Sequence, residues 1–349
     1  MTRVGIEPLR TFVTEAFEAL GLTPEDAAVF TGALIFSELR FHPGQGQGVA
    51  RLRRYQQRIE RGEVDPRAGW SIVKESPSLA LVDAHNGIGT VAAAKAMQLA
   101  VDKAKAGGIG TVIVRNSTHY GSSAVHACRA LDAGCIGIAY TNAGPEMAPW
   151  GGREGVTGTN PWSIAAPTDR GFPAVLDIAL TTAGKGMMNW YLREGRRMPL
   201  DWALTLEGEE TDDPGAAMAG ALLGIGGHKG YGLAFMTEAL TGMLSGGGFG
   251  LMPYSDPGRL DVSHSFTAID IAWFMDPDEY AARMGAFAEM AKSRALRPGF
   301  DEILIPGEQE ARRVADKEAR GVPLDDAVLA DLRALGRELN LTAELPDMA

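Results

Sequence analysis

His119 is one of six histidines in a chain of 349 residues, and it lies in the polar stretch STHYGSS, residues 117–123. This stretch follows the apolar run IGTVIV, residues 109–114, which is typical of a buried strand. In α/β folds, ligands gather at the carboxyl ends of strands. Imidazole titrates at about pH 6.5, so it can give a proton to a carbonyl oxygen and take it back. The placement of His119 therefore favours a role in acid–base chemistry.

Two glycine-rich stretches could bind phosphate groups. GIGTVA, residues 87–92, fits the G-x-G-x-x-A pattern of dinucleotide-binding loops. Its strand-to-helix turn is lengthened, and Arg115 stands where that pattern requires an acidic residue, so a simple strand-to-helix connection explains these glycines as well. GIGGHKGYG, residues 224–232, precedes a helical pattern. It is either an anion cradle of backbone N–H groups or an ordinary turn.

The remaining histidines and the cysteines do not form a metal-binding pattern. His126 lies seven residues after His119, and we expect it to pack or to support that residue. Cys128 and Cys135 are the only cysteines, which excludes a disulfide framework and favours core thiols. The other four histidines share no tight ligand spacing: His42, His85, His228 and His264. We expect no metal site, and no G-x-S-x-G motif points to a serine hydrolase.

The composition excludes several classes of partner. The net charge is −11, from 44 acidic and 33 basic residues, so a nucleic acid would meet a repelling field. The chain shows neither a secretion signal nor an uninterrupted span of about 18 apolar residues. These features predict a cytoplasmic protein that binds neither nucleic acid nor membrane.

The hydrophobic periodicity predicts an α/β region between two mainly helical ends. Thr23 is expected to cap a helix that runs to about residue 40, and a second helix is expected over residues 49–60. Between residues 66 and 185, short apolar runs alternate with helical patterns, which is typical of α/β folds. The expected strands are 78–82, 108–114, 135–140, 174–177 and 266–271, and the further helices are 91–105, 123–133 and 229–244.

Motifs over nearly the whole chain resemble, in order and spacing, those of the malate/L-lactate dehydrogenase family. They are THYG (118–121), TNAGPEMAPWGG (141–152), GTNPW (158–162), LDIALTTAGKG (176–186), MPLDWALTLEGEETDDP (198–214), GGHKGYGL (226–233) and PGE (306–308). This family also contains ureidoglycolate dehydrogenase, 2,3-diketogulonate reductase, sulfolactate dehydrogenase and cyclic ketimine reductases. The resemblance implies a non-Rossmann dinucleotide-binding α/β fold, with residues 1–75 and 285–349 as a helical lobe and residues 76–284 as the cofactor-binding and dimerisation region.

The resemblance also implies an activity: hydride transfer between NAD or NADP and a small 2-hydroxy or 2-keto acid, by a homodimer. His119 falls on a family acid–base histidine, and Arg51 falls on the arginine that holds the substrate carboxylate. Gln47, Tyr55 and Thr159 would then contact the substrate. The positions implied to contact the cofactor are Ala143, Asp177, Ile178, Ala179, Lys229, Pro306, Gly307 and Glu308. The GIGTVA stretch is then assigned to packing.

The segment before Arg51 departs from the family pattern. Two residues are inserted, and Gly46 and Gln47 replace a Ser-His pair that some family members use for acid–base work. The loss of that histidine leaves His119 for the role, unless His42 enters from the lengthened loop. A guanidinium fork suits a carboxylate because it offers two parallel hydrogen bonds, but Arg51 could also be an ordinary exposed helical arginine.

Three further questions remain open at the level of sequence. The loop between Asp177 and Lys185 is about two residues shorter than in many family members, so the choice between NAD and NADP is not determined. His264 and Arg259 are candidates for a second substrate-side cation. A cyclic ketimine reductase, and a family member that binds a ligand or partner without turnover, are the alternative functions.

Overall fold

The computed structural model describes residues 1–42 and 45–347 and is built around one seven-stranded sheet. Only β3 and β4 of this sheet run parallel, and every other neighbouring pair of its strands is antiparallel. In spatial order the strands are β2 (Ser71–Glu75), β3 (Leu79–Asp83), β4 (Ile109–Ser117), β8 (Val262–Asp270), β5 (Cys135–Thr141), β6 (Trp162–Ala166) and β7 (Ala174–Ile178). This confirms an α/β class whose sheet is not the parallel, doubly wound sheet of Rossmann folds.

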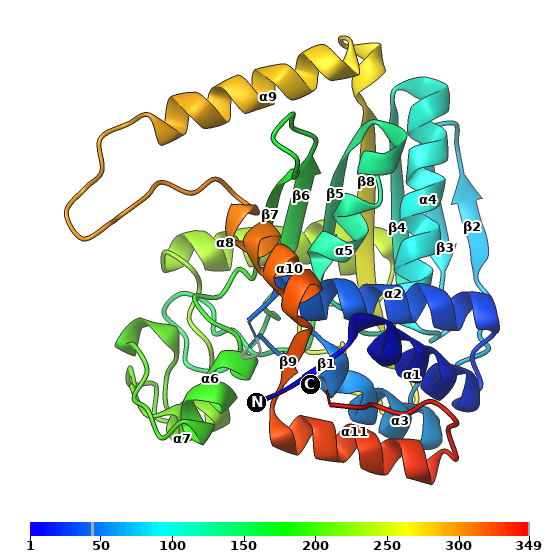
Figure 1. Ribbon diagram of the computed structural model, residues 1–349, viewed down its shortest axis with the longest axis vertical. Helices are drawn as coiled ribbons and strands as arrows, with labels where there is room; N and C mark the ends of the chain where they lie inside the picture. The colour runs from blue at the N-terminus through cyan, green and yellow to red at the C-terminus, as the bar shows by residue number, and fades with distance from the viewer. Residues whose placement is uncertain (43–44, 348–349) are drawn as a thin grey trace.

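The strand directions bring four carboxyl ends to one edge of the sheet. Because β8 runs antiparallel to both β4 and β5, and β6 runs antiparallel to both β5 and β7, the strands β3, β4, β5 and β7 all point the same way. The residues that follow β4, β5 and β7 therefore meet at a common edge, which is the lower edge in Figure 1. Neighbouring strands are about 4.8 Å apart, so this edge can hold an extended ligand.

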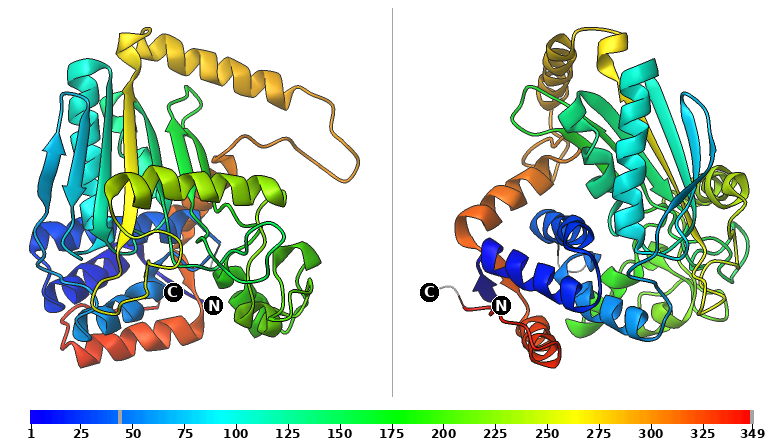
Figure 2. Two further views of the ribbon diagram at one scale, coloured as in Figure 1. Left: turned by 180° about the vertical axis from the view of Figure 1, so that it is seen from behind. Right: turned by 90° about the vertical axis from the view of Figure 1, so that its right-hand side faces the viewer.

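Helices cover both faces of the sheet. On one face lie α4 (Gly89–Gly107) and α5 (Ser123–Cys128), while α8 (His228–Glu238) crosses the other face, as the two views in Figure 2 show. The helix predicted over residues 229–244 is α8 together with the π-helical turn η5 (Ala239–Met243). The helix predicted over residues 123–133 is α5 and the 3-10 turn η3 (Leu131–Ala133).

A helical lobe joins the two ends of the chain. The short strands β1 (Thr2–Val4) and β9 (Val322–Leu324) pair antiparallel, and one apolar core includes Phe12 and Phe30 from the N-terminal part with Leu332 and Leu335 from the C-terminal part. The helices of this lobe are α1 (Ile6–Ala19), α2 (Pro24–Arg40), α3 (Leu52–Glu60), α10 (Glu308–Arg320) and α11 (Asp326–Glu338). The predicted Thr23 cap is confirmed, because its hydroxyl accepts from the N–H of Asp26 at 3.2 Å.

The other elements connect these layers. They are the helices α6 (Lys185–Arg193), α7 (Pro214–Ala219) and α9 (Pro277–Lys292), and the 3-10 turns η2 (Val49–Arg51), η4 (Leu200–Trp202) and η6 (Ile271–Trp273). Helix α9 and the segment after it project from the body of the molecule (Figure 1). Of the predicted lobe boundaries, residue 75 is the last residue of β2, and residue 285 falls inside α9. No helix in the described part of the chain is long and apolar enough to cross a membrane.

Sequence periodicity missed two strands of the sheet for different reasons. Strand β2 is exposed at all five residues, so no apolar alternation marks it. Strand β6 follows a long irregular segment, and its residues WSIAA are too few and too mixed to stand out. Both strands pair with a neighbour that the sequence did predict, β3 and β7 respectively.

A substitution at Gly110 on β4 tests how closely α4 packs on the sheet. A Cβ atom at this position would lie 2.1 Å from the carbonyl oxygen of Ala100, so we expect Gly110→Ala to lower the free energy of unfolding by about 1 to 3 kcal/mol. Thermal and urea unfolding measure the change. Gly107→Ala is the control, because a Cβ atom there meets nothing within 4 Å. Equal stability of the two variants would contradict the described packing.

Candidate active site

The candidate active site is a contact between three side chains at the carboxyl end of β4. His119 follows β4. Arg51 is the last residue of the 3-10 turn η2, and Tyr55 lies on helix α3, which begins at the next residue. Nε2 of His119 lies 3.1 Å from Nη1 of Arg51, and Nδ1 lies 2.8 Å from the hydroxyl oxygen of Tyr55. The structure thus brings together three residues that the sequence predicted for one site.

The neighbours of the His119 ring indicate which nitrogen carries its proton. A guanidinium group can only donate hydrogen bonds, so Nε2 must accept from Arg51. The proton of the neutral ring is then on Nδ1, which donates to the Tyr55 hydroxyl oxygen at 2.8 Å, whereas the N–H of Gly121, 3.2 Å from Nδ1, can donate to it only in the other tautomer. In this tautomer the free electron pair of Nε2 points at the position of the Arg51 guanidinium. A ligand oxygen atom that binds between Nε2 of His119 and the guanidinium of Arg51 contacts both groups.

The surroundings of His119 favour its neutral form. Burial, followed by the positive charge of Arg51, holds the pKa of His119 well below its usual range. Burial also lowers the pKa of Arg51, and burial raises the pKa of the Tyr55 hydroxyl. The described residues include no carboxylate that forms an ion pair with Arg51, whose Nε donates to the carbonyl of Gly46. The site therefore holds a cation that has no protein anion beside it.

Glycines in the GIGTVA stretch allow the loop of His119 to approach α4. A Cβ atom at Gly89 would lie 2.2 Å from the carbonyl oxygen of Thr118 and 2.7 Å from that of His119. The Thr118 hydroxyl donates to the carbonyl of Gly87 at 2.9 Å and accepts from the N–H of Gly89 at 3.0 Å. In the structure these glycines hold the active-site loop close to the helix, which is a packing role.

A buried aromatic cluster supports the loop from below. The rings of Tyr120 and His264 stack at 4.5 Å, and those of Tyr120 and His126 stack at 4.8 Å. His264 is fully buried between the hydroxyls of Thr141 and Ser117, at 2.7 and 2.9 Å. Burial lowers the pKa of His126 and of His264 to about 3 in each case.

The expectation that His264 is a second substrate-side cation is therefore wrong. A ring that is neutral and fully enclosed by protein cannot meet a carboxylate. Arg259, the other candidate, is half exposed and lies 3.3 Å from the carboxylate of Asp261, with which it forms an ion pair. His126 packs in the buried cluster, which is one of the two roles that we expected, and its Nε2 lies 2.8 Å from the carbonyl of Tyr120.

Helix α2 fixes the turn that carries Arg51. Glu38 of α2 accepts a hydrogen bond from the N–H of Val49 at 2.8 Å, the first residue of that turn. Gly48 passes so close to Glu38 that a Cβ atom would overlap the carboxylate. Burial raises the pKa of Glu38. No sequence pattern indicated Glu38, because its contact joins two segments that only the fold brings together.

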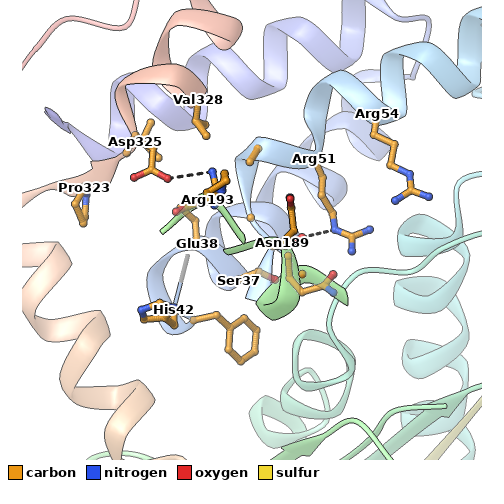
Figure 3. Close-up of a pocket in the computed structure, with 17 residues that line it drawn as sticks. Ser37, Glu38, His42, Arg51, Arg54, Asn189, Arg193, Pro323, Asp325 and Val328 are labelled. Carbon is orange, nitrogen blue, oxygen red and sulfur yellow. Dashed lines mark hydrogen bonds and ion pairs between the residues drawn. The ribbon is translucent and has the colours of Figure 1, made fainter. Parts of the chain in front are cut away.

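A cavity of about 290 Å³ lies beside Arg51, between α2, α6 and the start of α11. Figure 3 shows Arg51 and Glu38 on its walls, with Arg193 joined to Asp325 on the far side at 3.5 Å. Gln47 also lines this cavity, and its Oε1 is buried without a hydrogen-bond partner among the described residues. The Gln47 carbonyl oxygen is thus available to a ligand donor.

His42 lines the same cavity but does not take the place of His119. Its ring packs edge-on against Trp190 of α6, with ring centroids 4.8 Å apart. Burial lowers its pKa. Residues 43 and 44 of the lengthened loop lie outside the described residues. The contacts to Arg51 and Tyr55 belong to His119.

Several predicted cofactor positions meet at the ends of β5 and β7. The N–H of Ala143 donates to Oδ1 of Asn160 at 3.0 Å, and the carbonyl of Thr159 accepts from Leu180 at 2.8 Å. Leu180 follows Ile178 and Ala179, and its carbonyl accepts from Ile225 at 2.9 Å, just before α8. Hydrogen bonds therefore join the loops after β5 and β7 and the segment just before α8.

Lys229 lies at the start of α8 with an exposed side chain. Gly226 and Gly227 before it adopt left-handed φ angles of 63° and 66°, which a residue with a side chain adopts only with strain. The first N–H groups of a helix have no partner within the helix, and they carry partial positive charge. Together with the ammonium group of Lys229 they suit an anionic group such as a phosphate.

Asp177 and the PGE motif lie at β7, the last strand of the sheet, where the PGE turn contacts the amino-terminal half of the strand. Burial raises the pKa of Asp177 to about 7, against the hydrogen bond from the N–H of Ala124. Gly307 has a φ of 87° and lies against β7, where the carbonyl of Pro306 accepts from Val175 at 3.1 Å. Glu308 holds this turn in place.

The carboxylate of Glu308 is committed to protein partners. It accepts from Lys292 at 2.8 Å and from Arg312 at 2.7 Å. Although burial alone would raise its pKa, these hydrogen bonds lower it. The structure thus shows Glu308 joining α9, α10 and the edge of the sheet. No group of three or more potential metal ligands occurs in residues 1–42 and 45–347.

Comparisons with known proteins agree with this architecture. Residues 4–333 match the family model for malate/L-lactate dehydrogenase. The chain is 36% identical to a malate dehydrogenase of Pyrococcus abyssi over 97% of this chain and 95% of the relative. It is 31% identical to an L-sulfolactate dehydrogenase of Methanothermobacter thermautotrophicus, over 99% of this chain and all of the relative.

A solved structure has the same fold over its whole length. The crystal structure of malate dehydrogenase from Entamoeba histolytica superposes with a TM-score of 0.94 at 30% identity, covering 98% of this chain and 99% of that chain. The extent of both kinds of match includes the helical lobe, the sheet and the site described above. This chain is therefore a member of the malate/L-lactate dehydrogenase family of oxidoreductases.

Proposed function

We propose that this protein is an NAD(P)-dependent oxidoreductase that interconverts a small 2-hydroxy acid and the corresponding 2-keto acid. The observation that carries the proposal is the 3.1 Å contact between Arg51 and His119. A 2-hydroxy acid has its carboxylate and its hydroxyl on adjacent carbons. When the carboxylate binds the Arg51 guanidinium by two charge-assisted hydrogen bonds, the hydroxyl oxygen lies beside Nε2 of His119.

His119 then moves one proton at a defined atom. In oxidation, Nε2 accepts the hydroxyl proton, and Tyr55 holds Nδ1–H so that the ring keeps its orientation. In reduction, the imidazolium returns the proton to the carbonyl oxygen. A bound carboxylate neutralises the charge of Arg51, which otherwise lowers the pKa of His119. Substrate binding thus prepares the histidine to take up a proton.

The chain's own residues fit a nicotinamide dinucleotide. The positive-φ glycines before α8 and the ammonium group of Lys229 at its start suit a pyrophosphate, while the first-turn N–H of Gly230 donates to the carbonyl of Ile225 at 2.9 Å. The loops after β5 and β7 extend from there toward His119, along a continuous edge. A dinucleotide bound there supplies the hydride acceptor or donor. The residues Ala143, Ile178 and Ala179 lie on this path.

The pH dependence of oxidation tests the state of His119. Oxidation needs the neutral ring, and burial together with Arg51 lowers the pKa of that ring well below 6.5. We therefore expect kcat/KM for hydroxy-acid oxidation to stay constant as the pH falls through 6.5, and to decrease only at lower pH. In Arg51→Gln this decrease should begin at higher pH, because the neighbouring positive charge is absent. If kcat/KM of Arg51→Gln decreased at the same pH as in the wild type, this would contradict an effect of Arg51 on the pKa of His119.

An absorbance screen at the nicotinamide band tests the function itself. NADH and NADPH are each combined with a panel of 2-keto acids, including substrates with a second anionic group, and the reverse reaction is run with 2-hydroxy acids. A cyclic imine and its open-chain keto acid, compared directly, separate a ketimine reductase from a keto-acid reductase. Turnover of a keto acid supports the proposal. Tight binding of either coenzyme without turnover of any substrate would instead indicate a non-catalytic ligand-binding protein.

We further propose that the working form is a homodimer. Helix α8 exposes Leu233, Phe235 and Met236, and the projecting helix α9 exposes Phe287 and Met290, each by 47% or more. Exposed apolar side chains grouped in this way are typical of protein interfaces, and a second chain would cover those that α9 does not pack against its own chain. Sedimentation velocity should give about twice the 37.0 kDa of one chain. A monomer at micromolar concentration would contradict this assembly.

A further inference from the structure

Glu238, near the end of α8, has a buried carboxylate that is only 3% exposed. It accepts three hydrogen bonds from N–H groups: from Nδ2 of Asn160 at 2.8 Å, from Nδ2 of Asn142 at 3.1 Å, and from the backbone of Gly250 at 3.3 Å. Neither the sequence motifs nor the proposed reaction assigned a role to this residue.

The two amides cannot turn round to accept a proton from Glu238. Oδ1 of Asn142 already accepts from the N–H of Ser263 at 2.8 Å, and Oδ1 of Asn160 accepts from the N–H of Ala143 at 3.0 Å. Their amide nitrogens therefore face the carboxylate. Because every partner of Glu238 donates, the hydrogen bonds favour the charged carboxylate, although burial raises its pKa.

Among the described residues this buried carboxylate has no cationic partner. Over residues 1–42 and 45–347, no lysine, arginine or histidine forms an ion pair with Glu238. Buried charges are normally paired because desolvation of a lone charge is costly. A lone buried carboxylate beside a binding surface is suited to a ligand that carries positive charge.

The carboxylate lies beneath the loop that follows β5, because it accepts a hydrogen bond from Asn142 of that loop. Asn142 and Ala143 follow β5, which is two strand intervals from β4 and so about 10 Å from the strand that carries His119. On the proposed function, the nicotinamide ring must lie against the substrate carbon whose oxygen contacts His119. The ring end of the cofactor is therefore on this side of the edge, and Asp177 on β7 is on the far side.

We propose that Glu238 is a positioning residue whose buried negative charge also favours the oxidised coenzyme. Through Asn142 and Asn160 it fixes the loops that bear Ala143 and Thr159. The oxidised nicotinamide ring carries a positive charge, whereas the reduced ring is neutral. The carboxylate therefore stabilises the oxidised form more than the reduced form, and this inference rests on the proposed function.

The test compares dissociation constants, which do not depend on turnover. Titration calorimetry and fluorescence give the Kd of the oxidised and of the reduced coenzyme for the wild type, Glu238→Gln and the control Glu207→Gln, whose side chain lies on an exposed turn. We expect Glu238→Gln to raise the Kd ratio of oxidised to reduced coenzyme by about tenfold, which is the effect of one unit charge on another for a separation on the order of 10 Å and an effective dielectric constant of about 20. The control should keep the wild-type ratio.

A double variant separates the charge from the hydrogen bonds. In Glu238→Gln the new amide N–H faces N–H donors, so both affinities can fall for structural reasons. Asn142→Asp combined with Glu238→Gln returns one carboxylate to the network, where it accepts from the introduced amide and from the N–H of Ser263. It also loses the hydrogen bond from Nδ2 of Asn142 to the carbonyl of Gly248 at 2.8 Å, so both affinities can weaken while the ratio still reports the charge. This double variant should bring the ratio back toward the wild-type value. Glu238→Asp keeps the charge and should keep the ratio even where both affinities weaken.

Each outcome decides between the possibilities. An unchanged ratio in Glu238→Gln, or a ratio in Glu238→Asp as high as that in Glu238→Gln, would overturn the electrostatic role. If Glu238→Gln does not fold, the Kd ratio is measured in Glu238→Asp and in the double variant, which both retain a carboxylate. A ratio far from the wild-type value in both variants overturns the inference. If the wild type binds neither coenzyme, the proposed function itself fails, and that result is distinct from an unchanged ratio.

Discussion

His119→Ala should lower kcat by about 10² to 10⁴, the range typical of a positioned proton donor or acceptor. The variant loses the only imidazole that contacts both Arg51 and Tyr55 among the described residues. The fold should persist, because the aromatic cluster beneath the loop consists of other residues, Tyr120 and His264 among them. Steady-state kinetics in both directions measure the change.

The affinity for the coenzyme distinguishes a chemical role of His119 from a structural one. The Kd of NADH or NADPH should change less than about threefold in His119→Ala, since the predicted cofactor surface lies on other loops. His85→Ala is the control, because His85 is half exposed at the end of β3 and contacts Ser71 at 2.8 Å. If His119→Ala turned over substrate at the wild-type rate, another group would have to move the proton.

Arg51→Lys should lower kcat/KM for the keto acid by about 10² to 10³, mostly through a higher KM. A lysine ammonium group is a single point of contact, whereas a guanidinium group grips a carboxylate at two oxygens. Loss of one partner from a buried charge pair costs about 2 to 5 kcal/mol. Arg51 also donates to the carbonyl of Gly46, so the lysine cannot reproduce the orientation of the loop.

The control for Arg51 is an arginine on the same helical segment. Arg61 follows α3 and is 67% exposed, so Arg61→Ala should leave kcat/KM unchanged. An alcohol substrate that lacks the carboxylate offers a second comparison, because the wild type and Arg51→Lys should use it equally poorly. A wild-type KM for the keto acid in Arg51→Lys would show that the carboxylate binds elsewhere.

Local features were predictable from the sequence because they depend on nearby residues. The helix from Thr23 to Arg40 follows from a capping threonine, a proline in the first turn and apolar spacing. The strands β3, β4, β5 and β7 follow from short apolar runs. The motifs were sufficient to identify the family, since they consist of fixed residue types at fixed intervals.

The order of the strands in the sheet could not be predicted from such local patterns. Strand β8 lies between β4 and β5 although more than 120 residues separate it from β5 along the chain. Its partner choice depends on which apolar faces can be buried together, and that information is spread over the whole chain. The periodicity at His264 was equally ambiguous, because a histidine on a strand can face the core or a ligand.

By itself the sequence determined which side chains could do the chemistry: an imidazole after a strand, a guanidinium on a helical turn and a lysine after a glycine-rich loop. Only the tertiary structure decided which of them meet. It placed Arg51 against His119, enclosed His264 and put the carboxylate of Glu238 beneath the loops after β5. The physical reason is that helices and strands arise from interactions over a few residues, whereas a site is formed by packing between segments that are distant along the chain.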